Sequence, residues 1–182
     1  MKFNRTCSFL FSMVVAVGCM TGNGLAAPDR PQDFSIAYQL NPGSLPSPYY
    51  HEITINVDPS GKGEIELIPD YPKEGVPQWT ESFEADAGRL DALYGLLVDE
   101  AALTIDWRTP TPLRLGAPSE IIRITAQGQQ MEIPSQVVKD QVELRDKIAK
   151  AVKGLVPDDL WRDLKRRHRA FSRKHYPRGA GS

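Results

Sequence analysis

The chain has 182 residues, of which 41% are hydrophobic and 25% are charged, a composition typical of one globular domain. Its 15 prolines fall mostly between apolar segments, which excludes an unpatterned low-complexity chain. The net charge of −1 conceals an uneven distribution: residues 27–159 hold 12 basic and 22 acidic side chains, whereas residues 160–182 hold eight basic side chains and one acidic side chain. An acidic body joined to a basic C-terminus suggests either an internal contact between the two or an anionic partner.

The first 26 residues predict a secretion signal. Lys2 and Arg5 give a positive start, residues 9–17 form an apolar segment, and Gly24-Leu25-Ala26 supplies the small residues that signal peptidase accepts. The apolar segment is shorter than the roughly 20 residues that a membrane-spanning helix needs, and the alternative is a buried N-terminal helix. We expect export to the periplasm or cell envelope, with cleavage after Ala26.

Cys19 leaves a second form of processing open. The segment Ala16-Val17-Gly18-Cys19 resembles a bacterial lipobox with alanine in place of the usual leucine, so lipidation of Cys19 would anchor the protein to a membrane. Without lipidation we expect a secreted protein. Cys7 also lies in the predicted signal, so cleavage after Ala26 leaves a domain without disulfides. Its stability must then come from its core.

Alternation of apolar and polar residues predicts several short β-strands. The segment Asp58-Pro59-Ser60-Gly61-Lys62-Gly63 is a strong turn signal between two of them and predicts a hairpin. A second hairpin is expected around Gln127-Gly128-Gln129. The expected strands span residues 34–40, 49–57, 64–68, 79–84, 120–126 and 130–133, with a further short strand at 103–107.

Three helices are expected between and after these strands. Asp86 is a plausible N-cap for a helix over residues 87–102. A second helix ends at Gly154, and a third opens at Pro157-Asp158-Asp159, where acidic side chains complement the helix dipole. Apolar residues at helical spacing define the second and third helices: Val137, Leu144, Ile148, Ala151 and Val152, then Leu160, Trp161, Leu164 and Phe171.

Hairpin-linked strands without βαβ alternation predict an α+β fold, in which about three helices pack on one face of an antiparallel sheet of two or more hairpins. The domain organisation follows from these elements and from the composition. We expect a signal peptide at residues 1–26, a linker at 27–32, an α+β domain at 33–157, a basic C-terminal helix at 158–176 and a disordered tail at 177–182.

The histidines do not form a catalytic or metal-binding motif. His51 lies on an expected strand, where a histidine on a sheet face is the plainer interpretation. His168 and His175 share one helix face, but nothing nearby completes the three or four protein ligands that zinc needs. The sequence also lacks a Gly-x-Ser-x-Gly motif and a phosphate-binding glycine loop. We therefore assign no catalytic residue, metal ligand or cofactor.

Two groups of residues are candidates for binding a partner. Proline-flanked loops carry aromatic side chains that can anchor a peptide, a glycan or a protein, although the same side chains can instead cap the core. These are Tyr49, Tyr50, Tyr71 and Trp79. The expected C-terminal helix carries a basic face that can contact an anionic surface, such as phospholipid headgroups or an acidic envelope polymer, or can simply be solvated. This face comprises Arg162, Lys165, Arg166, Arg169, Arg173 and Lys174.

Three segments carry a resemblance to known sequences: residues 43–55, with Gly-Ser-Leu-Pro-x-Pro-Tyr-Tyr-x-Glu-Ile-Thr-Ile; residues 77–83, with Pro-x-Trp-x-Glu-Ser-Phe; and residues 155–161, with Leu-Val-Pro-x-x-Leu-Trp. The sequence resembles small exported or lipoprotein-like bacterial proteins of unknown function. The resemblance implies a location in the bacterial envelope and brings no activity, ligand or catalytic residue with it.

The leading functional hypothesis is a non-enzymatic envelope protein that binds another protein or an envelope polymer. Nucleic acid is a less favoured partner because the protein is expected to be exported. The alternative is a hydrolase that acts on an envelope substrate with His51 as its base.

Overall fold

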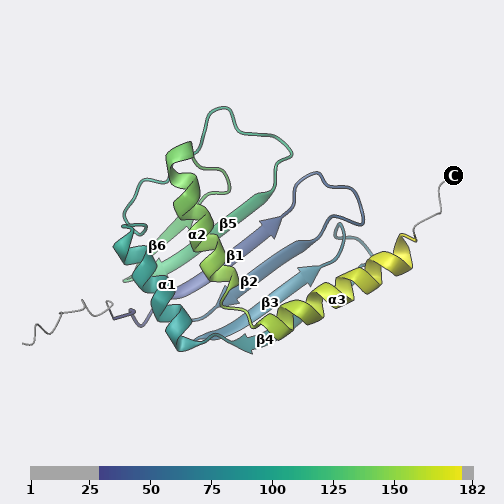
Figure 1. Ribbon diagram of the computed structural model, residues 1–182, viewed down its shortest axis with the longest axis horizontal. Helices are drawn as coiled ribbons and strands as arrows, with labels where there is room; N and C mark the ends of the chain where they lie inside the picture. Colours follow the sequence, from purple (N-terminus) through teal and green to yellow (C-terminus); the bar gives the residue numbers. More distant parts are fainter. Residues whose placement is uncertain (1–28, 178–182) are drawn as a thin grey trace, which may run out of the picture.

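A computed structural model describes residues 29–177 of the chain (Figure 1). The predicted secretion signal with Cys19 and nearly all of the predicted C-terminal tail lie outside the described residues. Within residues 29–177, no helix combines the length and the apolar character needed to cross a membrane.

The centre of the fold is a six-stranded sheet in the order β4-β3-β2-β1-β5-β6, and every neighbouring pair is antiparallel. The pairing of β2 with β3 and of β5 with β6 confirms the two predicted hairpins. The strands are β1 (Ser35–Asn41), β2 (Glu52–Val57), β3 (Lys62–Ile68), β4 (Trp79–Glu84), β5 (Ser119–Ala126) and β6 (Gln129–Ile133).

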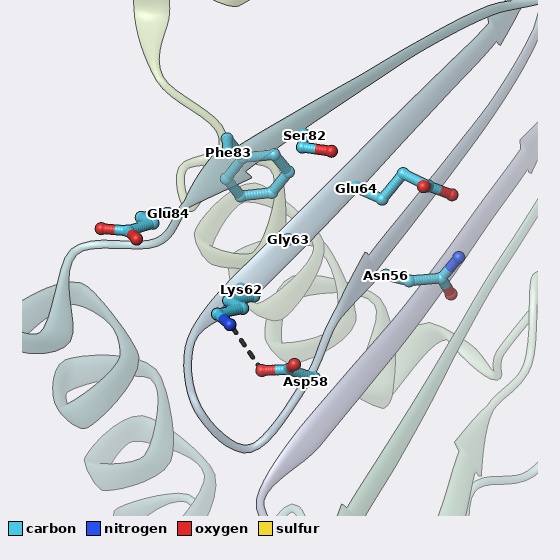
Figure 2. A pocket seen from close by; sticks show the side chains of 8 residues that line it. All are labelled: Asn56, Asp58, Lys62, Gly63, Glu64, Ser82, Phe83 and Glu84. Atoms are coloured by element: carbon cyan, nitrogen blue, oxygen red, sulfur yellow. Dashed lines mark hydrogen bonds between the residues drawn. The ribbon is translucent and has the colours of Figure 1, made fainter.

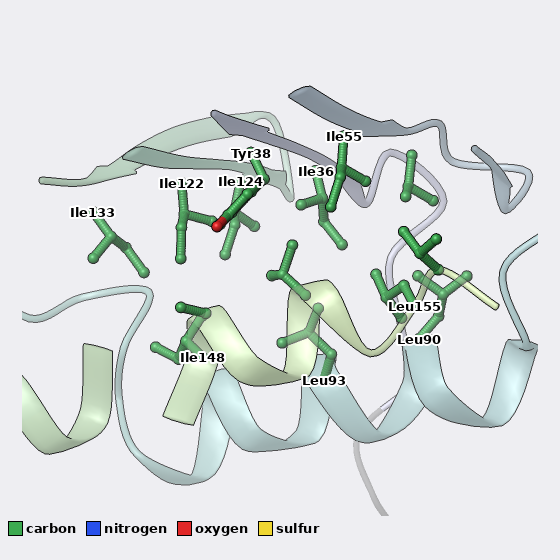
Figure 3. Close-up of a cluster of buried hydrophobic side chains, with 14 of the residues drawn as sticks. Ile36, Tyr38, Ile55, Leu90, Leu93, Ile122, Ile124, Ile133, Ile148 and Leu155 are labelled. Atoms are coloured by element: carbon green, nitrogen blue, oxygen red, sulfur yellow. The ribbon is translucent and has the colours of Figure 1, made fainter. Parts of the chain in front are cut away.

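Helices α1 (Ala87–Asp99) and α2 (Val142–Lys153) lie side by side across one face of this sheet (Figure 1). The apolar side chains of alternate strand positions meet those of the two helices and form the core (Figure 3). The predicted α+β fold is therefore confirmed. Fully buried members of the core include Tyr38, Ile55, Ile65, Leu93, Leu97, Ile122, Ile124 and Ile148.

The third helix, α3 (Asp158–His175), lies over the β2–β4 side of the same sheet face. Leu164 is its fully buried anchor, and Trp161 donates its indole N–H to the backbone oxygen of Lys153 at 3.0 Å. Further along the helix, Arg167 contacts Glu81 of β4 with a nitrogen–oxygen distance of 2.6 Å. Because all three helices share one face, the opposite face of the sheet presents its polar strand residues.

A glycine in β3 allows an aromatic side chain of the edge strand β4 to pack closely against the β3 backbone. Gly63 pairs with Phe83 of β4, and the Phe83 ring lies across the space that a side chain at position 63 would fill. A Cβ atom at Gly63 would come within 2.3 Å of the ring. The glycine that marks the predicted turn thus also permits close packing of an aromatic side chain.

Two sequence-based expectations need correction. Residues 103–107 form a turn followed by irregular backbone instead of a strand, since the backbone N–H groups of Thr104 and Ile105 both donate to the Ala101 oxygen. Trp107 donates its indole N–H to the backbone oxygen of Ala102 at 3.2 Å. The side chain of Gln141 binds the end of this segment. It accepts a hydrogen bond from the backbone N–H of Arg108 and donates one to the backbone oxygen of Asp106. His51 precedes β2, which begins one residue later, so it does not belong to a strand.

A carboxylate breaks the apolar pattern on the covered face of the sheet. Glu120 of β5 accepts hydrogen bonds from the Tyr38 hydroxyl at 2.6 Å, from Arg145 at 2.8 Å and from Lys153 at 2.9 Å. Arg145 also donates to the backbone oxygens of Glu120 and Pro134. These bonds join β1 and β5 to α2. Burial by itself raises the pKa of Glu120, but the three donors outweigh it and hold the pKa below its usual value.

We expect Arg145→Met to lower the free energy of unfolding by about 3 kcal/mol, because the half-buried Glu120 loses one of its two cationic partners and the backbone oxygens of Glu120 and Pro134 lose a donor. Arg123→Met is the matched control. Arg123 pairs with Glu132 at the same 2.8 Å, but that pair is exposed, and we expect a loss below about 1 kcal/mol. Urea denaturation at pH 7 measures both changes. Equal losses in the two variants would contradict a structural role for the Glu120 contacts.

Candidate functional site

The C-terminal half of α3 meets two loops at one end of the sheet, and this junction is the candidate site. The loops are residues 42–51, between β1 and β2, and residues 69–78, between β3 and β4. They are the proline-flanked loops that carry most of the aromatic candidates. The fold therefore brings the two groups of binding candidates, the aromatic loops and the basic helix, into one neighbourhood.

Asp70 joins the three segments of this junction. Its fully buried carboxylate accepts hydrogen bonds from the Ser47 hydroxyl at 2.5 Å, from the Tyr71 backbone N–H at 2.8 Å and from the Tyr176 hydroxyl. The Nζ atom of Lys73 lies 3.7 Å from Oδ2 of the same carboxylate. One side chain thus ties the 42–51 loop, the 69–78 loop and the residue that follows α3.

The pKa of Asp70 reflects a balance between burial and these donors. Burial disfavours the charged form and raises the pKa, but the hydroxyls of Ser47 and Tyr176, the Tyr71 N–H and the nearby Lys73 together lower it below the usual value. The carboxylate is therefore ionised at neutral pH and serves as an acceptor for its neighbours.

The imidazole rings of His51 and His168 lie next to each other at this junction. Their ring centroids are 5.1 Å apart, and Nδ1 of His51 lies 3.2 Å from the Tyr49 carbonyl oxygen. Burial, and secondarily the charge of His51, lower the pKa of His168, so its imidazole is neutral at pH 7. Nε2 of His168 is shielded from solvent and has no hydrogen-bond partner within residues 29–177.

A groove with a volume of about 800 Å³ runs between the end of α3 and the 42–51 loop. We call it the α3 groove. Its walls combine two arginines, two tyrosines, two prolines, a hydroxyl and an imidazole, a mixture suited to an amphipathic anion. The lining residues are Pro48, Tyr49, His168, Arg169, Ser172, Arg173, Tyr176 and Pro177.

The outer side of α3 carries the predicted basic face. Arg162, Lys165, Arg166, Arg169, Arg173 and Lys174 are all exposed. Within residues 29–177, Arg166 alone among these six forms an ion pair, with Asp163 of the same helix. The acidic body of the protein therefore neutralises little of this face, and its charge remains available to a partner.

The four aromatic candidates occupy different environments. Tyr49 is 68% exposed and lines the α3 groove, whereas Tyr50 is 3% exposed and contacts Glu52 and Asn41 through its hydroxyl. Burial, together with Glu52, raises the pKa of Tyr50 to about 12. Tyr71 is 41% exposed and stacks on Tyr50 with ring centroids 3.7 Å apart.

Trp79 packs against the core and against the edge of Phe171 of α3, with ring centroids 6.3 Å apart. Trp79 and Tyr50 therefore contribute to packing. Tyr49 is the most exposed of the four aromatic candidates, and Tyr71 is the next.

A second depression, of about 590 Å³, lies on the polar face of the sheet (Figure 2). Its polar side chains include Asn56, Glu64, Ser82 and Glu84, and at its end Asp58 accepts from the Lys62 backbone N–H at 3.0 Å. Carboxylates outnumber cations here, so this hollow does not favour an anion. In the β2–β4 region, the sheet face covered by α3 therefore carries positive charge, and the opposite face carries negative charge.

The junction does not assemble a recognisable catalytic or metal centre. Ser47 donates to Asp70, and no hydroxyl within residues 29–177 is hydrogen-bonded to a histidine ring, as nucleophilic catalysis uses. The same part of the chain holds no group of three or more histidine, cysteine, aspartate or glutamate side chains placed to bind a metal ion. His175 packs against Phe171, with ring centroids 4.3 Å apart and the two rings tilted by 30°.

Several residues of the site carried no local signal in the sequence. Asp70, Ser47 and Tyr176 come from three distant segments, so their contacts depend on the fold. Ser172 lies in no recognisable motif, although its position one turn after His168 places both on the groove side of α3. In a chain segment expected to be helical, this four-residue spacing is the signal that links the two residues.

Comparison with protein-family models and with curated proteins gives no match to this sequence. The interpretation of the site therefore depends on its geometry and charge.

We expect Asp70→Asn to destabilise the protein at pH 7, and the difference from the unchanged protein to shrink as the pH falls. The folded-state pKa lies below the unfolded value of about 4, so the carboxylate stabilises the fold above that pH and loses this effect at lower pH. Thermal unfolding between pH 7 and pH 2.5 measures the difference. Asp106→Asn, at an exposed side chain, should show no such trend. A constant difference at all pH values would contradict the role assigned to Asp70.

The adjacent tyrosines provide a second test. We expect Tyr50→Ala to lower the free energy of unfolding by about 3 kcal/mol, because a buried aromatic side chain is removed. Tyr49→Ala should change it by less than about 0.5 kcal/mol, because that ring is largely in solvent. Chemical denaturation of both variants measures the effect. A large loss for Tyr49→Ala would show that Tyr49 is a packing residue and not part of a binding surface.

Proposed function

We propose that this protein is a non-enzymatic binding module of the bacterial cell envelope, and that it holds an acidic envelope polymer along the basic face of α3. The observation that carries the proposal is the row of exposed cations on α3, of which one alone has a carboxylate partner within residues 29–177. The envelope location comes from the predicted secretion signal, which remains a prediction.

The packing of α3 supports this function. The helix is anchored by the buried Leu164 and by the contact between Arg167 and Glu81, so its basic face is held on a fixed support. A charged surface on a rigid element loses less conformational freedom on binding than the same charges on a mobile segment. The arrangement therefore favours a role for these side chains beyond solvation.

The two sides of the molecule differ in charge, so an anionic partner is expected to bind on the α3 side. The polar face of the sheet, which lies opposite α3, carries Glu64 and Glu84 and repels anions. An anionic partner is thus attracted to one side of the molecule only. A polymer fits this arrangement better than a flat membrane, because the row of cations leads into the concave α3 groove with its aromatic wall.

The test is binding of the full mature protein to polygalacturonate, an acidic polysaccharide, with neutral dextran as the control polymer. We expect binding that weakens steadily as salt increases, since screening acts over about 8–10 Å. The double change Arg162→Gln and Lys165→Gln should weaken binding at low salt by about tenfold, because each exposed charge contact contributes roughly 0.7 kcal/mol.

The matched control is Lys147→Gln with Lys150→Gln, which removes the same charge from exposed positions on α2. Polymer binding should be unchanged in that variant. Equal weakening by both double changes would show that net charge, and not the α3 face, attracts the polymer. Stronger binding to vesicles of anionic phospholipid than to the polymer would instead identify a membrane surface as the partner. Absence of binding to both would overturn the proposal.

A further inference from the structure

The α3 groove contains two cations that are placed to act together. Arg169 and Arg173 are four residues apart, so both project from the same side of α3. Both are exposed, and neither forms an ion pair within residues 29–177. Guanidinium groups bind carboxylates and phosphates through paired hydrogen bonds, which gives them geometric specificity beyond their charge.

Opposite these arginines, the groove offers an aromatic wall. Tyr49 is 68% exposed and follows Pro48, which also lines the groove. An exposed tyrosine ring provides apolar area with little conformational entropy to lose on binding, and its face can pack against the C–H groups of a ring-shaped ligand. The Tyr176 hydroxyl is already bonded to Asp70, so this second tyrosine has a fixed position.

We propose that the α3 groove binds one unit of an anionic saccharide, with its acidic group between Arg169 and Arg173 and its ring against Tyr49. This proposal rests on the proposed function, because it identifies the part of the acidic polymer that the protein recognises. The volume of about 800 Å³ lies within the range of small-molecule sites. Charge attracts the polymer to α3, and the groove selects a sugar unit from it.

The remaining wall supplies neutral polar groups for sugar hydroxyls. The Ser172 hydroxyl donates to the His168 carbonyl at 2.9 Å, and its oxygen keeps the capacity to accept a hydrogen bond. Among residues 29–177, the neutral imidazole of His168 finds no partner for its Nε2 atom, a rare condition for a shielded polar atom.

The experiment uses small ligands, which cannot span the whole basic face. Calorimetric or NMR titration of the full mature protein with trigalacturonate should show saturable binding at one site, and the neutral trisaccharide maltotriose should bind at least tenfold more weakly. The double change Arg169→Gln and Arg173→Gln should reduce trigalacturonate affinity at least tenfold. The control, Arg162→Gln with Lys165→Gln, removes equal charge from the same helix outside the groove and should retain the affinity within about twofold.

Tyr49→Ala separates saccharide recognition from simple anion binding. It should lower the affinity for trigalacturonate several-fold and leave the binding of inorganic phosphate unchanged. Equal effects of the two double changes on trigalacturonate, or an unchanged affinity in Tyr49→Ala, would overturn the groove proposal. Polymer binding that depends on the α3 charges would survive that outcome, so failure of the groove and failure of the proposed function are distinguishable.

Discussion

The contacts of Glu120 hold α2 on the sheet, and α2 in turn is bonded to the start of α3, the helix that carries the candidate site. This carboxylate sits on the covered face, where an unpaired charge would be strongly destabilising, so Arg145 and Lys153 of α2 must remain above it. Lys153 also accepts a hydrogen bond from Trp161 at the start of α3 through its backbone oxygen. A chain of polar contacts therefore runs from the sheet through α2 to α3.

The other end of α3 depends on a second buried carboxylate. Asp70 receives hydroxyls from Ser47 and Tyr176 and thereby fixes the two loops against the helix. The groove that results is bordered by these buried contacts and by the exposed side chains of Arg169 and Arg173. Such a division suits binding, because the buried contacts supply shape while the long side chains adjust to the ligand. It suits hydrolysis less well, since the serine hydroxyl is occupied by the carboxylate and not by a histidine.

Most of the fold could be predicted from the sequence, because strands and helices with one buried face leave periodic patterns. The strand residues of both hairpins and the Asp86 cap of α1 followed from local chemistry. The site could be predicted only in outline, as aromatic loops and a basic helix. The meeting of His51 with His168 arises from tertiary packing, which no local pattern records. Glu120 is a different case, since it shares the alternation of Ile122 and Ile124 and could have been recognised as a charge on a core face.

The separation of charge across the β2–β4 region has a consequence for the encounter with a partner. With cations along α3 and carboxylates such as Glu64 and Glu84 on the far side of the sheet, the molecule is an electric dipole. Near a negatively charged layer, the field exerts a torque that turns α3 inward before any contact is made. Under the proposed function, the protein therefore approaches its anionic partner with α3 foremost, and fewer encounters present the acidic face. A molecule bound in this way keeps its acidic face outward, so a layer of such molecules would present negative charge again and limit further deposition on top of itself.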